Sequence, residues 1–316
     1  MSTDPLARAA RALRAGHLVA FPTETVFGLG ADASNPAAVA RIFATKGRPA
    51  DHPLIVHVST AALLPELAAE IPAYAHALAA AFWPGPLTLI LERSAAVPDA
   101  VTGGQPTVGV RVPSHPVAVQ LLREFESLGG RGVAAPSANR FGRVSPTTAA
   151  AVRDELGALM NPDDLILEGA PSDVGIESTI VECTGPAPVV LRPGSITDDM
   201  IVAATGLALG ERDESIRVSG SLPAHYAPTA TVVLDVTPQP GDGFVALAEH
   251  DTPEGVVRLA APGSAEGFAR ELYAALRAAD EAGLARVVVT SPPGPGIAVA
   301  IRDRLRRASH GSGDAN

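Results

Sequence analysis

The sequence predicts an α/β protein built from a large mixed, twisted sheet with flanking helices, followed by a smaller Rossmann-like α/β domain with a parallel sheet. Short apolar strands alternate with helical segments through the first two thirds of the chain. A stretch without periodicity, rich in Gly, Ser, Asp and Arg, follows at 206–228, and beyond it strands again alternate with helices. We therefore expect a first domain at 1–205, a linker at 206–228 and a second domain at 229–316.

Helices of the first domain are indicated by their ends. Apolar positions at helical spacing over 5–15 stop at Gly16, a typical residue after a helix. The segment 35–44 begins with Asn35 as N-cap and Pro36 at its first position. A third helix is expected over 66–82, before the Pro-Gly-Pro run at 84–86. Short apolar runs predict the strands, at 17–21, 54–58, 87–92, 107–112, 133–135, 165–168, 178–182 and 189–192.

The second domain is predicted from one long helix and four strands. Apolar residues recur on one helical face over 264–282, at Phe268, Leu272, Ala275, Leu276 and Ala279. Strands are expected at 231–236, 243–248, 256–259 and 286–290. A Pro- and Gly-rich loop at 292–296 precedes a last helix, and 309–316 is expected to be a frayed tail. The first strand has no glycine-rich fingerprint after it, so no dinucleotide is assigned.

Composition limits the class of protein. The 316 residues, 47% hydrophobic and 18% charged, are enough for two globular domains. The net charge of −10 disfavours a dedicated nucleic-acid binder. A single cysteine, Cys183, excludes an intramolecular disulfide and a thiolate metal site, and we expect an inert thiol at a strand end. The N-terminus shows no signal peptide and no apolar run reaches ~20 residues, so we expect a cytoplasmic protein without membrane contact.

Two polar motifs suggest a phosphate-rich ligand. Lys46 and Arg48 lie one residue apart, and an ammonium beside a two-pronged guanidinium suits phosphate oxygens. Ser137 and Asn139 follow an apolar run and could bond the same ligand without adding charge. Taken alone, the first motif is more often a solvated surface pair and the second an ordinary turn.

The surrounding blocks decide between these interpretations. The chain carries, in order, Phe21-Pro-Thr-Glu-Thr-Val-Phe-Gly-Leu-Gly30, Lys46-Gly-Arg-Pro49, Pro53-Leu-Ile-Val-His57, Phe82-Trp-Pro-Gly-Pro-Leu-Thr88, Val110-Arg-Val-Pro113, Val133-Ala-Ala-Pro-Ser-Ala-Asn139, Glu177-Ser-Thr-Ile-Val181 and Leu191-Arg-Pro-Gly194. These blocks resemble the threonylcarbamoyl-AMP synthase family, whose main domain is called YrdC-like. The tail, with His225-Tyr-Ala-Pro228 and Arg302-Asp-Arg-Leu-Arg306, is similar to the C-terminal domain of the long form.

The resemblance implies a reaction. L-Threonine, bicarbonate and ATP would condense to threonylcarbamoyl-AMP with release of pyrophosphate, for threonylcarbamoyl modification of the adenosine beside the tRNA anticodon. A downstream tRNA threonylcarbamoyl transferase would take the product, so tRNA would be a partner only indirectly. No Asp/Glu/His cluster has the spacing of a protein metal cage, so Mg²⁺ would arrive with ATP on its phosphate oxygens.

The resemblance also assigns site residues. The phosphate-handling, catalytic set would be Lys46, Arg48, Ser137 and Asn139. Threonine-binding positions would be Thr25, His57, Arg111, Ala135 and Ser178. Nucleotide-binding positions would be Arg48, His52, Thr107, Ser137, Ser145, Arg192 and Tyr226, with Tyr226 in a linker that closes over the site as a lid.

For three of these residues the local sequence also allows a purely structural role. Thr25 could be a turn cap, and a lone histidine such as His57 on an apolar strand is usually a core residue. Arg111 lies in an apolar strand, where an unpaired guanidinium is costly to bury. A bidentate partner is therefore required, which a threonine carboxylate could supply and a structural salt bridge could supply instead.

Three positions depart from the family pattern. Phe27 stands where Tyr is frequent, and His52 where Asn is common, which puts the nucleotide contact of His52 in question. The lead-in to Tyr226, Val218-Ser-Gly-Ser-Leu-Pro-Ala-His-Tyr226, lacks the usual Ser-Pro-Gly and its following basic residues.

Two other classes compete with the enzyme: a double-stranded RNA-binding module, disfavoured by the net charge, and a carbamoyl-handling enzyme of the hydrogenase-maturation type, disfavoured by its missing acylphosphatase and zinc-finger segments.

Overall fold

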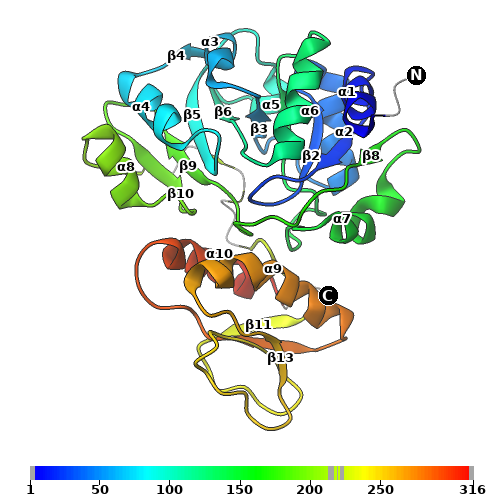
Figure 1. The fold of residues 1–316 in the computed structure, drawn as a ribbon, viewed down its shortest axis with the longest axis vertical. Coiled ribbons are helices and arrows are strands. Elements are labelled where there is room, and N and C mark those ends of the chain that lie inside the picture. Colours follow the sequence, from blue (N-terminus) through cyan, green and yellow to red (C-terminus); the bar gives the residue numbers. More distant parts are fainter. Residues whose placement is uncertain (1–3, 213–216, 219, 221–223, 313–316) are drawn as a thin grey trace.

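The chain forms two sheets, each with its own helices (Figure 1). The computed structural model describes residues 4–212, 217–218, 220 and 224–312. Part of the linker predicted at 206–228 therefore lies outside the described residues. The mixed α/β class, with a large mixed sheet and a separate parallel one, is confirmed.

The larger sheet follows the order β10-β9-β5-β6-β3-β7-β2-β1-β8, with β4 paired to β5. Both parallel and antiparallel neighbours occur: β3 runs parallel to β6, whereas β5 runs antiparallel to it. The strand bounds are β1 Val19–Phe21, β2 Gly28–Asp32, β3 Ile55–His57, β4 Ala68–Glu70, β5 Leu87–Arg93, β6 Thr107–Arg111, β7 Val133–Ala134, β8 Leu165–Ile166, β9 Thr179–Glu182 and β10 Val189–Arg192.

Helices pack on this sheet in pairs, with α1 against α6, α4 against α8, and α2 on β2. Their N-caps follow the sequence: Asn35 accepts from the backbone N–H groups of Ala37 and Ala38 at the start of α2. The bounds are α1 Pro5–Arg14, α2 Pro36–Lys46, η1 Ala61–Leu63, α3 Leu64–Leu67, α4 Ala73–Phe82, α5 Asp99–Thr102, α6 Pro116–Ser127, α7 Ala149–Leu156, η2 Gly157–Leu159 and α8 Asp198–Thr205.

The second sheet is parallel throughout and has the order β11-β14-β12-β13. Its strands are β11 Thr231–Leu234, β12 Gly243–Val245, β13 Val257–Ala260 and β14 Arg286–Val289. Helix α9, Ala265–Glu281, buries the apolar face predicted from its sequence, and α10 spans Ile297–Gly311. Both helices lie between the small sheet and the first domain (Figure 1).

Several element predictions are wrong. The helix expected over 66–82 is divided: α3 ends at Leu67, β4 pairs with β5, and α4 begins only after Pro72, whose ring disfavours helical backbone at the preceding residue. Strand β2 was not expected, because its sequence Gly-Leu-Gly-Ala-Asp has low strand propensity. Helices α6, α7 and α8 were also missed, and α10 extends through the first residues of the expected frayed tail.

Candidate functional site

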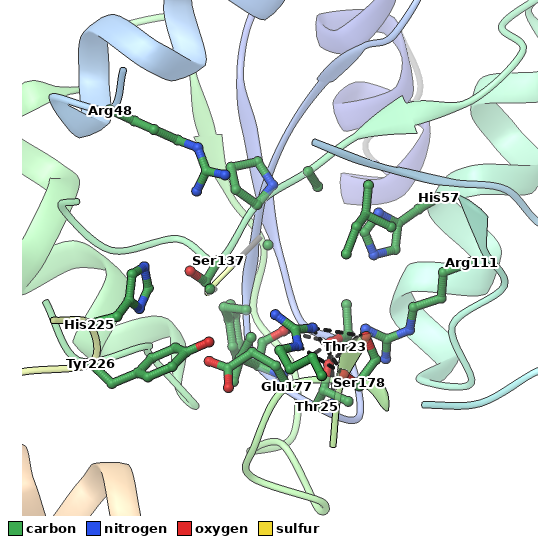
Figure 2. Close-up of a pocket in the computed structure, with 18 residues that line it drawn as sticks. Thr23, Thr25, Arg48, His57, Arg111, Ser137, Glu177, Ser178, His225 and Tyr226 are labelled. Atoms are coloured by element: carbon green, nitrogen blue, oxygen red, sulfur yellow. Dashed lines mark hydrogen bonds between the residues drawn. The ribbon is translucent and has the colours of Figure 1, made fainter. Parts of the chain in front are cut away.

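A cavity lies between loops that are far apart in the sequence. The loop after β1, the ends of β3 and β6, the segment 135–137 and the segment 177–178 form its walls, and Gly220, His225 and Tyr226 border it from the linker. The structure brings nine of the predicted site residues to this cavity: Thr25, Arg48, His57, Arg111, Ala135, Ser137, Ser178, Arg192 and Tyr226. His57 and Arg111 lie on one side, opposite Arg48, His225 and Tyr226 (Figure 2).

Arg111, at the end of β6, has a protein partner. Its Nη2 donates to Glu24 Oε1 over 2.6 Å, Nη1 donates to Thr25 Oγ1 over 2.9 Å, and Nε donates to the carbonyl of Gly85 over 3.3 Å. Both ion-pair side chains are about 5% exposed. The structural salt bridge considered for this guanidinium is present, and a threonine carboxylate stays a predicted second partner.

Glu24 is held as an anion by this arrangement. Burial alone would raise the pKa of its carboxyl, but the charge and hydrogen bonds of Arg111, with backbone N–H donors including that of Ser114, lower the pKa below 4.5. Of the five N–H groups of Arg111, three donate to described residues. The other two donate to no described residue.

His57, the last residue of β3, is neutral. Burial, with the nearby charge of Arg111, lowers the pKa of its imidazole from 6.5 to about 3. Its Nδ1 atom is buried and has no hydrogen-bond partner among the described residues. A buried polar atom without a partner beside a cavity points to a ligand, because leaving it unsatisfied is costly.

Ser178 lies next to Arg192 at the base of the pocket. Its Oγ is 2.8 Å from Thr88 Oγ1 and accepts a hydrogen bond from Arg192 Nη2 over 3.2 Å. Arg192 also donates from Nε and Nη2 to the carbonyl of Ser178, over 3.1 and 3.0 Å. At Gly194 any Cβ would collide with the backbone of Thr179, so glycine allows the Leu-Arg-Pro-Gly loop to lie against β9.

The opposite side is cationic. Arg48 donates from Nη2 to the carbonyl of Pro53 over 3.0 Å, and burial lowers the pKa of its guanidinium to about 10, so it remains charged at neutral pH. Tyr226 is 1% exposed, has a positive φ of 64°, and stacks on Tyr273 with ring centroids 5.8 Å apart. Burial raises the pKa of Tyr226, and its hydroxyl has no hydrogen-bond partner among the described residues.

Five predicted site residues do not line this cavity: Lys46, His52, Thr107, Asn139 and Ser145. Lys46 is buried and donates from Nζ to the carbonyls of Ser137, over 2.6 Å, and Asn139. Burial and the neighbouring Arg48 lower the pKa of Lys46 well below 10.5. This lysine therefore holds the Ser-Ala-Asn loop, and the alternative of a solvated surface pair is excluded.

The other four have structural partners of their own. Asn139 donates to the carbonyls of Arg140 and Arg143, which fixes the turn after Ser137. Ser145 does not line the pocket, but its Oγ donates over 2.7 Å to Oε1 of Glu177, which does. His52 makes an edge contact with the Phe141 ring at 5.3 Å, and Thr107 borders a second, smaller cavity beside β3.

Two buried carboxylates at the site were not predicted. Glu24 and Glu177 both lie inside sequence blocks that carried the family resemblance, and their position beside Thr25 and Ser178 was the available signal. Burial alone would raise the pKa of Glu177, but Arg304 and Arg192, with the Ser145 hydrogen bond, lower it to about 2. Both carboxylates are therefore anions engaged by arginine.

The described residues offer little to a metal ion. No group of three or more His, Cys, Asp or Glu side chains among them could hold one. The carboxylate of Glu177 at the cavity and that of Glu24, the partner of Arg111, are already paired with arginines. In the same described part of the chain, no helix is long and apolar enough to span a membrane.

Known families match almost the whole chain. The family described as Telomere recombination matches residues 11–194, and the one described as Threonylcarbamoyl-AMP synthase, C-terminal domain, matches residues 196–310. A threonylcarbamoyl-AMP synthase of Pyrococcus abyssi is 38% identical over 322 residues, covering 95% of this chain and 93% of that protein. The corresponding protein of Bacillus subtilis is 39% identical, covering 98% and 94%.

Solved structures agree with this assignment. P. abyssi Sua5 complexed with L-threonine has a TM-score of 0.86 and 37% identity, covering 97% of this chain and 94% of that chain. HypF from T. kodakarensis, at 16% identity and a TM-score of 0.53, covers 96% of this chain and 37% of its own, and shares only the fold. The chain therefore belongs to the threonylcarbamoyl-AMP synthase family, in the long form that carries a C-terminal domain after the YrdC-like domain.

Proposed function

We propose that this protein is an L-threonylcarbamoyladenylate synthase, which condenses L-threonine, bicarbonate and ATP into threonylcarbamoyl-AMP and pyrophosphate. The observation that supports this best is the two-sided cavity. One wall holds small polar groups around a buried ion pair, at Thr25, His57 and Arg111, and the other holds the cation Arg48 beside Ser137 (Figure 2).

The first wall suits threonine. The two remaining N–H groups of Arg111 would bind the carboxylate of the amino acid, with Thr25 holding the guanidinium in place. The unpartnered Nδ1 of neutral His57 would hydrogen-bond the threonine side chain or amine without introducing a charge. Ala135 and Ser178 would close the remaining contact surface.

The second wall suits the phosphates of ATP. Arg48 lies at the pocket with Ser137, while Lys46 and Asn139 fix the loop that presents Ser137. Arg192 and Tyr226 border the same cavity, and Ser145 would act through Glu177. These groups would stabilise negative charge as pyrophosphate leaves, which is electrostatic work that requires no proton transfer by the protein.

The nucleophile would come from the substrates. Threonine nitrogen would attack the carbon of bicarbonate and lose a proton as a C–O bond breaks and water leaves, giving a carbamate. An oxygen of that carbamate would then attack the α-phosphorus of ATP while the bond to pyrophosphate breaks. Because Glu24 and Glu177 are paired with arginines, they do not fit a protein-held metal site. We therefore propose that Mg²⁺ enters bound to phosphate oxygens, and that the product passes to a tRNA threonylcarbamoyl transferase.

The test is pyrophosphate release from ATP, measured with and without L-threonine and bicarbonate. Release that requires both co-substrates supports the function, and release indifferent to threonine rejects it. Arg48→Met should lower the rate by about 100-fold or more, because a preorganised charge at the leaving group is removed. The matched control Arg8→Met, on the exposed face of α1, should keep the wild-type rate. Equal rates in the two variants would exclude Arg48 from the site.

A further inference from the structure

We propose that Arg304, on helix α10, is a positioning residue for the nucleotide side of the cavity, so that the C-terminal domain sets the affinity for ATP far more than the affinity for threonine. The inference rests on the proposed function, because it names which substrate the far domain controls. Its basis is the set of groups that this one side chain contacts.

Arg304 is fully buried although it is an arginine on the last helix of the chain. Its Nε donates to Glu177 Oε2 over 2.8 Å, and its Nη2 donates to the carbonyl of Pro193 over 3.0 Å. Its guanidinium carbon lies 5.4 Å from the centre of the Tyr226 ring. Asp303 accepts from Nη1 over 2.6 Å, so two carboxylates balance the buried charge.

The contacts with Glu177, Pro193 and Tyr226 each lead to a predicted nucleotide-binding residue. Glu177 receives Arg304 on Oε2 and holds Ser145 on Oε1. Pro193 directly follows Arg192 in the Leu-Arg-Pro-Gly loop. Tyr226 itself is contacted by both Arg304 and Tyr273. A single guanidinium therefore fixes three separate segments of one wall.

Helix α9 supports the same wall with residues on one face. Tyr273 donates its hydroxyl to Glu177 Oε2 over 2.9 Å. Arg270 donates to the carbonyl of Asp173 over 2.9 Å, and Arg277 donates to the carbonyl of Val144. A Cβ at Gly175 would collide with the backbone of Ala269 and Arg270, so α9 lies directly against the loop that contains Gly175.

Apolar contacts join the same parts. Val26, Val144 and Ile176 of the first domain are buried in one cluster with Phe268, Tyr273 and Ile301 of the second. Val144 precedes Ser145, and Ile176 precedes Glu177, so the segments that carry Ser145 and Glu177 are anchored in the second domain's core. The position of Glu177 therefore depends on α9 and α10.

The threonine wall depends on the second domain less directly, through Val26 next to Thr25 and through Ser178 next to Glu177. The side chains of Glu24, Thr25 and Arg111 make their described hydrogen bonds to first-domain residues, and His57 lies on β3 in the same domain. Figure 2 shows His57 and Arg111 across the cavity from Tyr226. Removing Arg304 should consequently weaken the binding of the nucleotide far more than that of threonine.

Full-length Arg304→Met, Arg304→Lys, Glu177→Gln and the double variant Glu177→Gln/Arg304→Met would be compared by calorimetry with a non-hydrolysable ATP analogue and, separately, with L-threonine. We expect Arg304→Met to weaken analogue binding by about tenfold or more and threonine binding by less than about twofold. Arg304→Lys should lie between the two, because it restores the charge opposite Glu177 without the fork that reaches Pro193. The matched control Arg302→Met, on the same helix, removes hydrogen bonds only to the carbonyls of Pro292 and Gly294 and should bind both ligands normally.

The double variant decides the question if Arg304→Met leaves Glu177 unpaired and fails to fold. It removes both charges of the pair, and we expect it to fold with an analogue affinity below that of Glu177→Gln alone, since Pro193 and Tyr226 remain unsupported. An analogue affinity in the double variant no lower than that of Glu177→Gln would overturn the proposal and leave Arg304 a charge-balancing residue. Equal loss of both ligands would overturn it as well. Threonine-dependent pyrophosphate release by the wild-type protein tests the function separately, so a failure there is distinguishable from a failure of the positioning role.

Discussion

The ion pair between Glu24 and Arg111 should contribute to both folding and threonine binding, and the two contributions can be separated. Both side chains are about 5% exposed, and Glu24 accepts in addition from the backbone N–H of Ser114. Removing one member of a buried pair leaves the other as an uncompensated charge, which costs about 3–5 kcal/mol. Arg111→Met and Glu24→Gln should each lower the free energy of unfolding by an amount in this range.

The double variant Glu24→Gln/Arg111→Met should recover most of that loss. Replacing a buried ion pair by groups of similar volume is often close to neutral for stability, because both desolvation costs disappear together. Threonine affinity should not recover, since the two N–H groups available for the ligand carboxylate are lost with Arg111. Loss of such a bidentate contact weakens binding by about 2–5 kcal/mol.

Urea unfolding would measure the stabilities, with equal m-values required before midpoints are compared. Calorimetry with L-threonine and with an ATP analogue would measure binding. A double variant as unstable as the single variants would refute the charge-compensation argument. A stable double variant that binds threonine normally would refute the assignment of Arg111 to the threonine side.

Acid should abolish the same contribution. Because the folded-state pKa of Glu24 is lowered below 4.5, its stabilisation is present above the unfolded-state pKa and is lost as pH falls through the folded-state value. Wild-type stability should therefore decline below about pH 4.5 more steeply than that of the double variant. Parallel curves for the two proteins would contradict this linkage.

Two further predictions follow from buried groups. The folded-state pKa of His57 is lowered from 6.5 to about 3, so the stability due to its neutral form is fully present above pH 6.5 and is lost as the pH falls from 6.5 to 3. The urea midpoint of His57→Gln should therefore depend less on pH over this range than that of the wild-type protein. The same pH dependence in both proteins would contradict this prediction. Cys183 is buried, and burial raises the pKa of its thiol, so a chromogenic disulfide reagent should titrate no thiol in the native protein and one in urea.

The sequence predicts elements well where local pattern and tertiary packing agree. Helix α9 follows from its apolar face, and α2 follows from Asn35 and Pro36 at its start. Strand β2 could not be predicted from propensity, because its glycines are selected by close packing: a Cβ at Gly30 would lie 2.7 Å from Val133 Cγ1. The expected helix over 66–82 failed because pairing of β4 with β5 overrides local helical preference.

The site was predictable as a set of residues and unpredictable as a set of contacts. Nine residues named from the motifs line the cavity. Their identity could be predicted because each lies in a short local block of sequence. The charge pairing was not visible, because Arg111 is 87 residues from Glu24 and Arg304 is 127 residues from Glu177. Lys46 shows the same limit: its motif indicates a phosphate cation, whereas only the fold shows that its ammonium holds the carbonyls of the Ser-Ala-Asn loop.

The two walls of the cavity depend on different parts of the chain. The threonine wall is fixed by Glu24 and Arg111 within the first sheet and its loops. The nucleotide wall includes Glu177, which is held by Tyr273 and Arg304 of the second domain, and its neighbour Ile176 is buried in that domain's core. A chain ending near residue 205 would expose this apolar surface and leave Glu177 without its principal cation. We therefore propose that the C-terminal domain forms part of the wall that would receive ATP.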